Sequence, residues 1–154
     1  MQTVDQQFVE TFDEVWQTSL ANSWSYAYPV VLWSGVTSLT LVSLIRHQWL
    51  RRAVTLILVL GLTVAATWSS SREIQEKWRI RSDWAYSHED QMTAAHWDAL
   101  TADGKDLLLG PLVNGFLACV LFIAVCTVLT LVRFALVRCR KSTVDHCSPF
   151  GEVP

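Results

Sequence analysis

Three long apolar runs divide this chain of 154 residues. They cover residues 29–45, 53–68 and 111–132, and none of them contains an Asp, Glu, Lys, Arg or His. A helix on the surface of a soluble protein keeps one polar face, whereas these runs are apolar all round. We therefore expect an all-α membrane protein with three transmembrane helices, at residues 29–45, 53–68 and 110–133.

Small and polar residues inside the apolar runs indicate where the helices pack against each other. Small side chains let two helix backbones approach closely, and an amide can hydrogen-bond from one helix to the next. The residues expected in these contacts are Ser34, Ser38, Gly61, Ala65, Asn114 and Gly115. The hydroxyl groups of the first run can also bond back to their own helix, so they do not rule out a span. Pro111 suits the first position of the third helix, where a missing N–H costs nothing.

The N-terminal arm, residues 1–28, contains a predicted amphipathic helix with an aromatic face. Phe8, Phe12 and Trp16 recur at every fourth position, and the charged residues of the arm are all acidic. Helices that lie on a membrane surface usually carry Lys and Arg, so we expect this face to dock onto protein. The partner interface is expected to include the loop tryptophans, buried against the N-terminal helix or another subunit: Trp78, Trp84 and Trp97.

The segment at residues 69–109 is expected to form a small helical loop outside the membrane. Ser70 and Glu73 resemble a capping box that starts a helix, and one helix continuing from the second span is the alternative. Arg81 shares a face of this helix with apolar neighbours. A second loop helix is expected to end at Gly104 as a left-handed cap, with Asp103 in a solvated turn.

Charge predicts the orientation. The connector at residues 46–52 holds three Arg and no acid, and Arg133 and the tail at residues 134–154 add further basic residues after the third run. The first 28 residues hold four acids and no Lys or Arg. The positive-inside rule therefore places the N-terminus outside and the C-terminus in the cytoplasm, in a bacterial-type inner membrane. Basic residues that follow the second run oppose this orientation, but acids are interspersed with them. Cys139, beside the membrane, is a candidate for acylation.

Candidate chemistry is sparse. His88, Met92 and His96 are spaced so that one helix would bring them together, as in a copper or haem site, but no complete metal motif accompanies them. We expect no metal and no cofactor. The sequence has no phosphate-binding glycine loop and no nucleophile elbow, so we expect that the chain is not an enzyme. The net charge of −2 gives no reason to expect nucleic acid as a partner.

These features favour a structural or accessory subunit of a larger membrane complex, with lipids and other membrane-protein subunits, or further copies of itself, as partners. A first alternative is a self-assembling pore. Three spans, an outside N-terminus and a short basic tail are similar to the layout of phage holins, and this resemblance concerns topology only. A second alternative is a redox subunit that binds a metal or haem through His88 and His96.

Overall fold

The structure is a computed structural model that describes residues 11–146, with side chains as far as Arg138. These residues form helices and no β-strand, which confirms the expected all-α class. In chain order the elements are α1 (Phe12–Thr18), the 3₁₀ turn η2 (Ser19–Ala21), α2 (Ala27–Ser43), α3 (Gln48–Ser87), the 3₁₀ turn η3 (Glu89–Gln91) and α4 (Ala94–His146).

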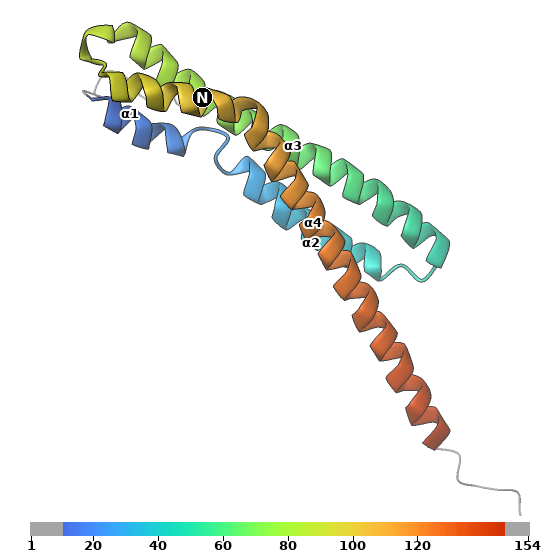
Figure 1. The fold of residues 1–154 in the computed structure, drawn as a ribbon. Coiled ribbons are helices and arrows are strands. Elements are labelled where there is room, and N and C mark those ends of the chain that lie inside the picture. Colours follow the sequence, from blue (N-terminus) through green and yellow to red (C-terminus); the bar gives the residue numbers. More distant parts are fainter. Residues whose placement is uncertain (1–10, 147–154) are drawn as a thin grey trace, which may run out of the picture.

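The helices form an elongated bundle with two distinct ends (Figure 1). α3 and α4 lie side by side, α2 packs against both, and α1 packs on the far end of α3. We call the end that contains α1 and the turn between α3 and α4 the head, residues 11–21 and 78–103. We call the end where α2 connects to α3 the base, residues 43–55 and 126–133. α4 continues beyond the base as a single helix (Figure 1).

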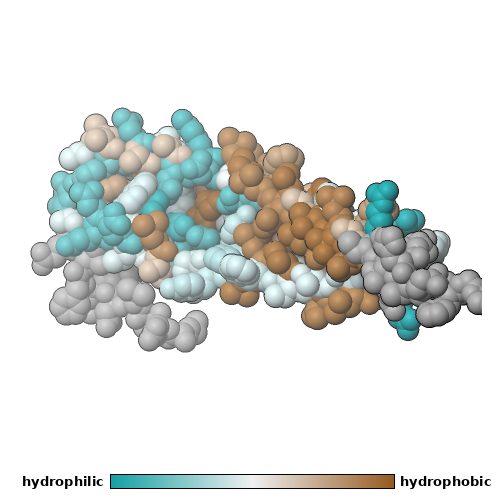
Figure 2. All heavy atoms as spheres, turned by 90° about the horizontal axis from the view of Figure 1, so that it is seen from below, coloured by the Kyte–Doolittle hydropathy of each residue, from teal (hydrophilic) through white to brown (hydrophobic). Residues whose placement is uncertain are grey.

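Two of these helices, α3 and α4, are long and apolar enough to cross a membrane, and α2, with 17 residues, is apolar but shorter. In the most apolar stretch of α3 and of α4, only 17 % of the residues are buried. Large side chains therefore point outward along the middle of the bundle. We call this part of the bundle the apolar zone; its exposed large apolar side chains lie on α2 and on residues 56–68 and 108–123 of α3 and α4. Figure 2 shows it between the hydrophilic head and a few hydrophilic residues at the base.

Several expected helix boundaries are wrong. α3 runs without a break from the second apolar run into the head, so Ser70 does not start a helix, and the alternative of one continuous helix is confirmed. α4 likewise passes through Gly104 and Pro111, which therefore neither end nor begin it. Gly104 has no positive φ, as a left-handed cap would require. α4 bends along its first half (Figure 1), and a proline inside a helix is a usual cause of bending.

Close packing of α4 on α3 explains why its glycines lie inside the helix. A Cβ atom on Gly104 would lie 3.2 Å from Nε1 of Trp78, and one on Gly110 would lie 2.6 Å from Cδ1 of Ile74. Each glycine therefore makes room for a large side chain of α3. The stop signal that a glycine carries in the sequence is overridden because this contact stabilises the continued helix.

Two separate clusters of buried side chains hold the bundle together. The head cluster consists of Phe12, Val15, Trp84, Ala85 and Leu100. The second cluster joins α2, α3 and α4 within the apolar zone and consists of Leu39, Ala66, Ala118 and Phe122. Between the clusters, the three long helices share polar contacts. Asn114 donates to Ser70 Oγ at 2.7 Å, and its carbonyl accepts from Tyr28 Oη at 3.0 Å.

Candidate functional site

Arg81 lies at the centre of the head, where α1, α3 and α4 meet. Its side chain, which comes from α3, is only 4 % exposed. The guanidinium forms an ion pair with Asp103 of α4, with 2.7 Å between Nη1 and Oδ1. Its Nε donates a hydrogen bond to Ser19 Oγ in η2 at 2.8 Å. One side chain therefore connects three segments that are far apart in the sequence.

The same guanidinium lies over the ring of Trp16 in α1, with Cζ 3.5 Å from the ring centroid. Nη2 also donates to the backbone carbonyl of Trp16 at 3.4 Å. A cation stacked on an aromatic ring contributes about 2 kcal/mol when both groups are shielded from water. Because Arg81 and Trp16 come from different helices, this contact holds α1 on the rest of the head.

Asp103 is the acidic partner in this site, and only one of its two carboxylate oxygens is paired in the described structure. Its Oδ2 is buried and has no hydrogen-bond partner among the described residues. A charge that is shielded from water is costly unless it is paired, so Asp103 depends on Arg81. The expectation that Asp103 lies in a solvated turn is wrong, since it lies within α4 and its side chain faces α3.

A surface ion pair on α3 differs from the buried pair of Arg81 and Asp103 in its exposure to water. Arg79 lies two residues from Arg81, its side chain is 63 % exposed, and its Nη2 lies 2.6 Å from Glu76 Oε1. The hydrogen bond that Arg79 donates to the Glu76 carboxylate raises the pKa of Arg79 above its ordinary value. An exposed pair of this kind contributes little to stability because water and salt screen it.

The aromatic side chains of the head pack around this ion pair. α1 begins with a capping box in which Thr11 and Glu14 bond to each other's backbone N–H, and this fixes the start of the helix. Phe12 is 5 % exposed and Trp84 is 8 % exposed, and their ring centroids lie 6.1 Å apart. Trp16, Trp78 and Trp97 are partly buried against the same cluster.

The described residues among those expected at a partner interface are thus packed within the chain itself. The sequence left open whether the loop tryptophans are buried against the N-terminal helix or against another subunit. In the structure they pack in the same cluster as residues of α1. Their contact with another subunit stays a prediction. Phe8 lies outside the described residues.

The three residues considered as metal or haem ligands do not share a helix. His88 follows the end of α3, Met92 lies just after η3, and only His96 is inside α4. His88 stacks on Trp84 with ring centroids 4.5 Å apart, and His96 stacks on Phe12 at 4.8 Å. The assumed helical spacing is therefore wrong, because the chain turns between the two histidines. Among the described residues, no three His, Cys, Asp or Glu side chains are grouped as metal ligands.

A cleft of about 500 Å³ adjoins the ion pair on the side facing the apolar zone. Its polar lining includes Lys77, Arg81, Asp103, Asp106 and Asn114. α3 contributes the cations of the cleft and α4 contributes its carboxylates, so the lining has charges of both signs.

The expected helix-packing residues fall into three pairs. Asn114 and Gly115 lie at the crossing of the long helices, where a Cβ atom on Gly115 would overlap Oγ1 of Thr67. Ser34 and Gly61 are exposed, and a Cβ atom on Gly61 would meet nothing within 4 Å. The remaining two, Ser38 and Ala65, are half-buried.

Sequence reasoning missed a glycine of α2 that packs against α4. Gly35 is buried, and a Cβ atom there would lie 2.5 Å from Cε1 of Phe122. The spacing of Gly35 and Leu39 could have indicated this contact, because they are four residues apart and both are buried in the bundle. Ser34 and Ser38, which were expected to pack there, each lie one position away on the helix.

Comparison of the chain with models of known protein families, with curated proteins and with solved structures finds no match.

Proposed function

We propose that this chain is a small integral membrane protein with three spans, formed by α2 and by the apolar parts of α3 and α4, and that it acts as a structural or accessory subunit of a membrane complex. The observation that carries the proposal is the apolar zone, in which the long helices turn large apolar side chains outward (Figure 2). Lipid accommodates such a surface, whereas water does not.

Aromatic contacts support a common membrane boundary near the head. Trp24, just before α2, packs edge-on against Trp68 of α3 with ring centroids 5.5 Å apart. Tryptophan is enriched where the hydrocarbon of a bilayer meets its polar surface. α2 covers about 26 Å, slightly less than the hydrocarbon thickness of roughly 30 Å, and residues next to its ends would complete the crossing.

The distribution of charge supports an orientation with the head outside and the base in the cytoplasm. Residues 15–72 and 107–144 contain no Asp or Glu, so the base has only basic charges. The structure brings two of its cations, Arg51 and Arg133, to one cavity although they are far apart in the sequence. The acids of residues 73–106 lie in the other part of α3 and α4 and in η3 between these helices. This is the asymmetry that the positive-inside rule associates with a cytoplasmic base.

The exposed small residue Gly61 supports the role as a subunit. Within the chain it has open space around it, although it lies in the middle of an apolar helix. A glycine facing outward in a membrane allows the backbone of another helix to approach closely. We infer that a partner helix packs on α3 at Gly61.

The test of this contact replaces Gly61 with a larger residue. In a Gly61→Leu variant, a partner helix would be held away from α3, so the mass of the complex extracted in mild detergent should fall to that of the single chain. Ala53→Leu makes a similar enlargement at another exposed position of α3 and should leave the complex intact. Light scattering combined with size-exclusion chromatography measures the mass. An unchanged complex in the Gly61 variant would refute the proposed contact.

A second candidate, the self-assembling pore, is favoured by one observation on α2. Ser34, Thr37 and Thr40 are exposed and recur every third position, and each hydroxyl bonds to a carbonyl of its own helix. Such a polar stripe could line water in a ring of copies. The same mass measurement separates the candidates, because a pore would appear as a large assembly of this chain alone.

A further inference from the structure

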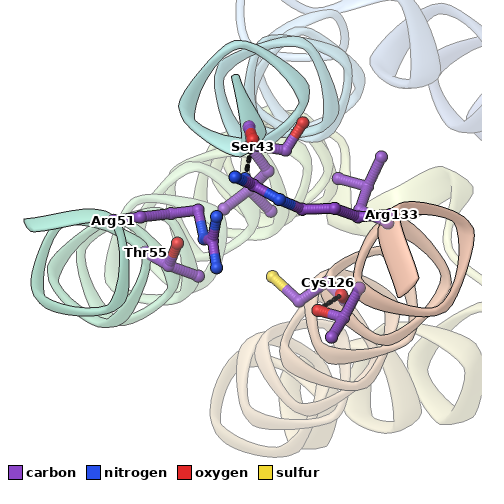
Figure 3. A pocket seen from close by; sticks show the side chains of 8 residues that line it. Ser43, Arg51, Thr55, Cys126 and Arg133 are labelled. Atoms are coloured by element: carbon purple, nitrogen blue, oxygen red, sulfur yellow. Dashed lines mark hydrogen bonds between the residues drawn. The ribbon is translucent and has the colours of Figure 1, made fainter. Parts of the chain in front are cut away.

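The base contains a cavity of about 70 Å³ between α2, α3 and α4 (Figure 3). A single water needs roughly 10–15 Å³ of such volume, so this cavity has room for a larger polar group. Arg51 of α3 and Arg133 of α4 both line it, and their guanidinium groups point toward each other across the space between the helices (Figure 3).

The two arginines differ in what they bind within the chain. Nη1 of Arg133 donates to the backbone carbonyls of Ser43 at 2.8 Å and Ile45 at 3.4 Å, where α2 ends. Nη1 of Arg51 is buried and has no hydrogen-bond partner among the described residues. A buried charged donor without a partner is costly, and its position in a cavity indicates where an acceptor would fit.

Among the residues whose side chains the structure describes, no carboxylate lies at the cavity to serve as that acceptor. The lining contains no Asp or Glu, and residues 15–72 and 107–144, which include the whole base, contain none either. The remaining polar groups of the lining are the Cys126 thiol and three hydroxyls. Those of Ser43 and Thr130 already donate to their own helix backbone, whereas the hydroxyl of Thr55 has no such bond in the described structure.

We propose that this cavity binds a phosphate group. Two guanidinium groups approach it from different helices, and Thr55, one turn from Arg51 on α3, adds a hydroxyl donor. A tetrahedral phosphate has oxygens in several directions to meet them, and guanidinium groups bind phosphate through paired hydrogen bonds. The anion would also relieve the repulsion between the two cations.

The phosphate could belong to a lipid headgroup or be free in solution. A lipid source rests on the proposed function, because the base must then lie at the cytoplasmic surface of a bilayer, where basic pockets between helices bind lipid headgroups. Free phosphate needs no bilayer. The two sources are therefore separated by testing both probes on the same purified protein.

The experiment uses the full chain in an uncharged detergent and measures the thermal unfolding midpoint with each probe at constant ionic strength. The probes are phosphatidylglycerol, inorganic phosphate, a galactolipid without phosphate, and oleate as a carboxylate. We expect phosphatidylglycerol or inorganic phosphate to raise the midpoint and the galactolipid and oleate not to do so. A response to inorganic phosphate identifies free phosphate as sufficient, and a response to phosphatidylglycerol alone identifies the lipid.

Matched variants show whether the effect comes from this cavity. Arg51→Gln should weaken the binding of the active probe about tenfold or more, as expected for the loss of a charged hydrogen bond. Arg52→Gln removes the same charge from the neighbouring exposed position and should change binding little. Arg51→Lys keeps the charge without the planar fork and should give an intermediate loss.

The folding of the variants is checked without a probe. Arg51→Gln should unfold at a midpoint no lower than that of the natural chain, because the side chain of Arg51 makes no hydrogen bond in the described structure. Equal losses in the Arg51→Gln and Arg52→Gln variants, no loss in either, or an equal response to oleate would overturn the proposal. If the three-span arrangement fails, the inorganic phosphate measurement still tests the cavity by itself.

Discussion

Replacing Arg81 with methionine removes the charge at the centre of the head while keeping most of the apolar stem. The substitution eliminates the ion pair with Asp103, the hydrogen bond to Ser19 and the contact with the ring of Trp16. Two of these contacts, those with Ser19 and Trp16, belong to the segment that includes α1. We therefore expect α1 to separate from α3 more often, while α3 and α4 stay paired elsewhere along their length.

The magnitude follows from the contacts that α1 loses. A shielded cation–aromatic contact contributes about 2 kcal/mol. A hydrogen bond from a charged group contributes about 1.5–3 kcal/mol. Methionine recovers some packing on Trp16, so we expect the separation of α1 to become easier by about 2–4 kcal/mol. Since 1.4 kcal/mol corresponds to a factor of ten, this is a change of roughly 30- to 700-fold in the population of the separated state.

Thiol labelling measures this population directly. Val15 is 3 % exposed and lies in the head cluster, so a Val15→Cys substitution, made in a chain without its native cysteines, reacts only when α1 separates. Gln17→Cys, on the exposed side of α1, gives the rate without protection. The ratio of the two rates gives the free energy of separation before and after the Arg81 substitution.

Arg79→Met is the control, because it removes the same side chain from an exposed ion pair two residues away. It should change the labelling of Val15→Cys less than about threefold. Similar labelling rates in the Arg79→Met and Arg81→Met variants would refute the assignment of Arg81 as the residue that holds α1. Adding Asp103→Asn to Arg81→Met should recover part of the loss, because it removes the carboxylate left without its partner.

Two further predictions concern the apolar zone and the orientation. Gly35→Val should lower stability by about 1–3 kcal/mol, because the new side chain must displace the ring of Phe122, whereas Gly61→Val should leave the unfolding midpoint of the isolated chain in detergent nearly unchanged. Under the proposed orientation, a cysteine at Gln91 should react with an impermeant reagent on intact cells, and one at Gln48 should react only after permeabilisation. The opposite pattern would invert the orientation.

The apolar runs identified the helices but not their ends. Residues 69–87 follow an apolar run and carry good helix formers, so nothing local breaks α3 there. Gly104 and Pro111 carry local stop signals, yet α4 passes through both because its face packs on Trp78 and Ile74 of α3. Boundaries of this kind depend on contacts between helices, which a single sequence pattern does not contain.

The candidate sites were partly visible in the sequence. Arg81 shared a helical face with apolar neighbours, which indicated burial, but its pairing with Asp103 depends on how the chain turns after α3. Charge counting placed Arg51 and Arg133 at the same end of the molecule. It could not show that both point into one cavity, because that follows from the angle at which α3 and α4 cross.

The continuity of α4 has a mechanical consequence. This helix has 53 residues, extends from the head through the apolar zone and continues past the base. About 35 of its residues follow Pro111, a length of roughly 53 Å at 1.5 Å per residue. A tilt of about 5° at the bend would move the far end by roughly 5 Å. A small change of angle at the bend is therefore amplified along α4 into a larger displacement beyond the base.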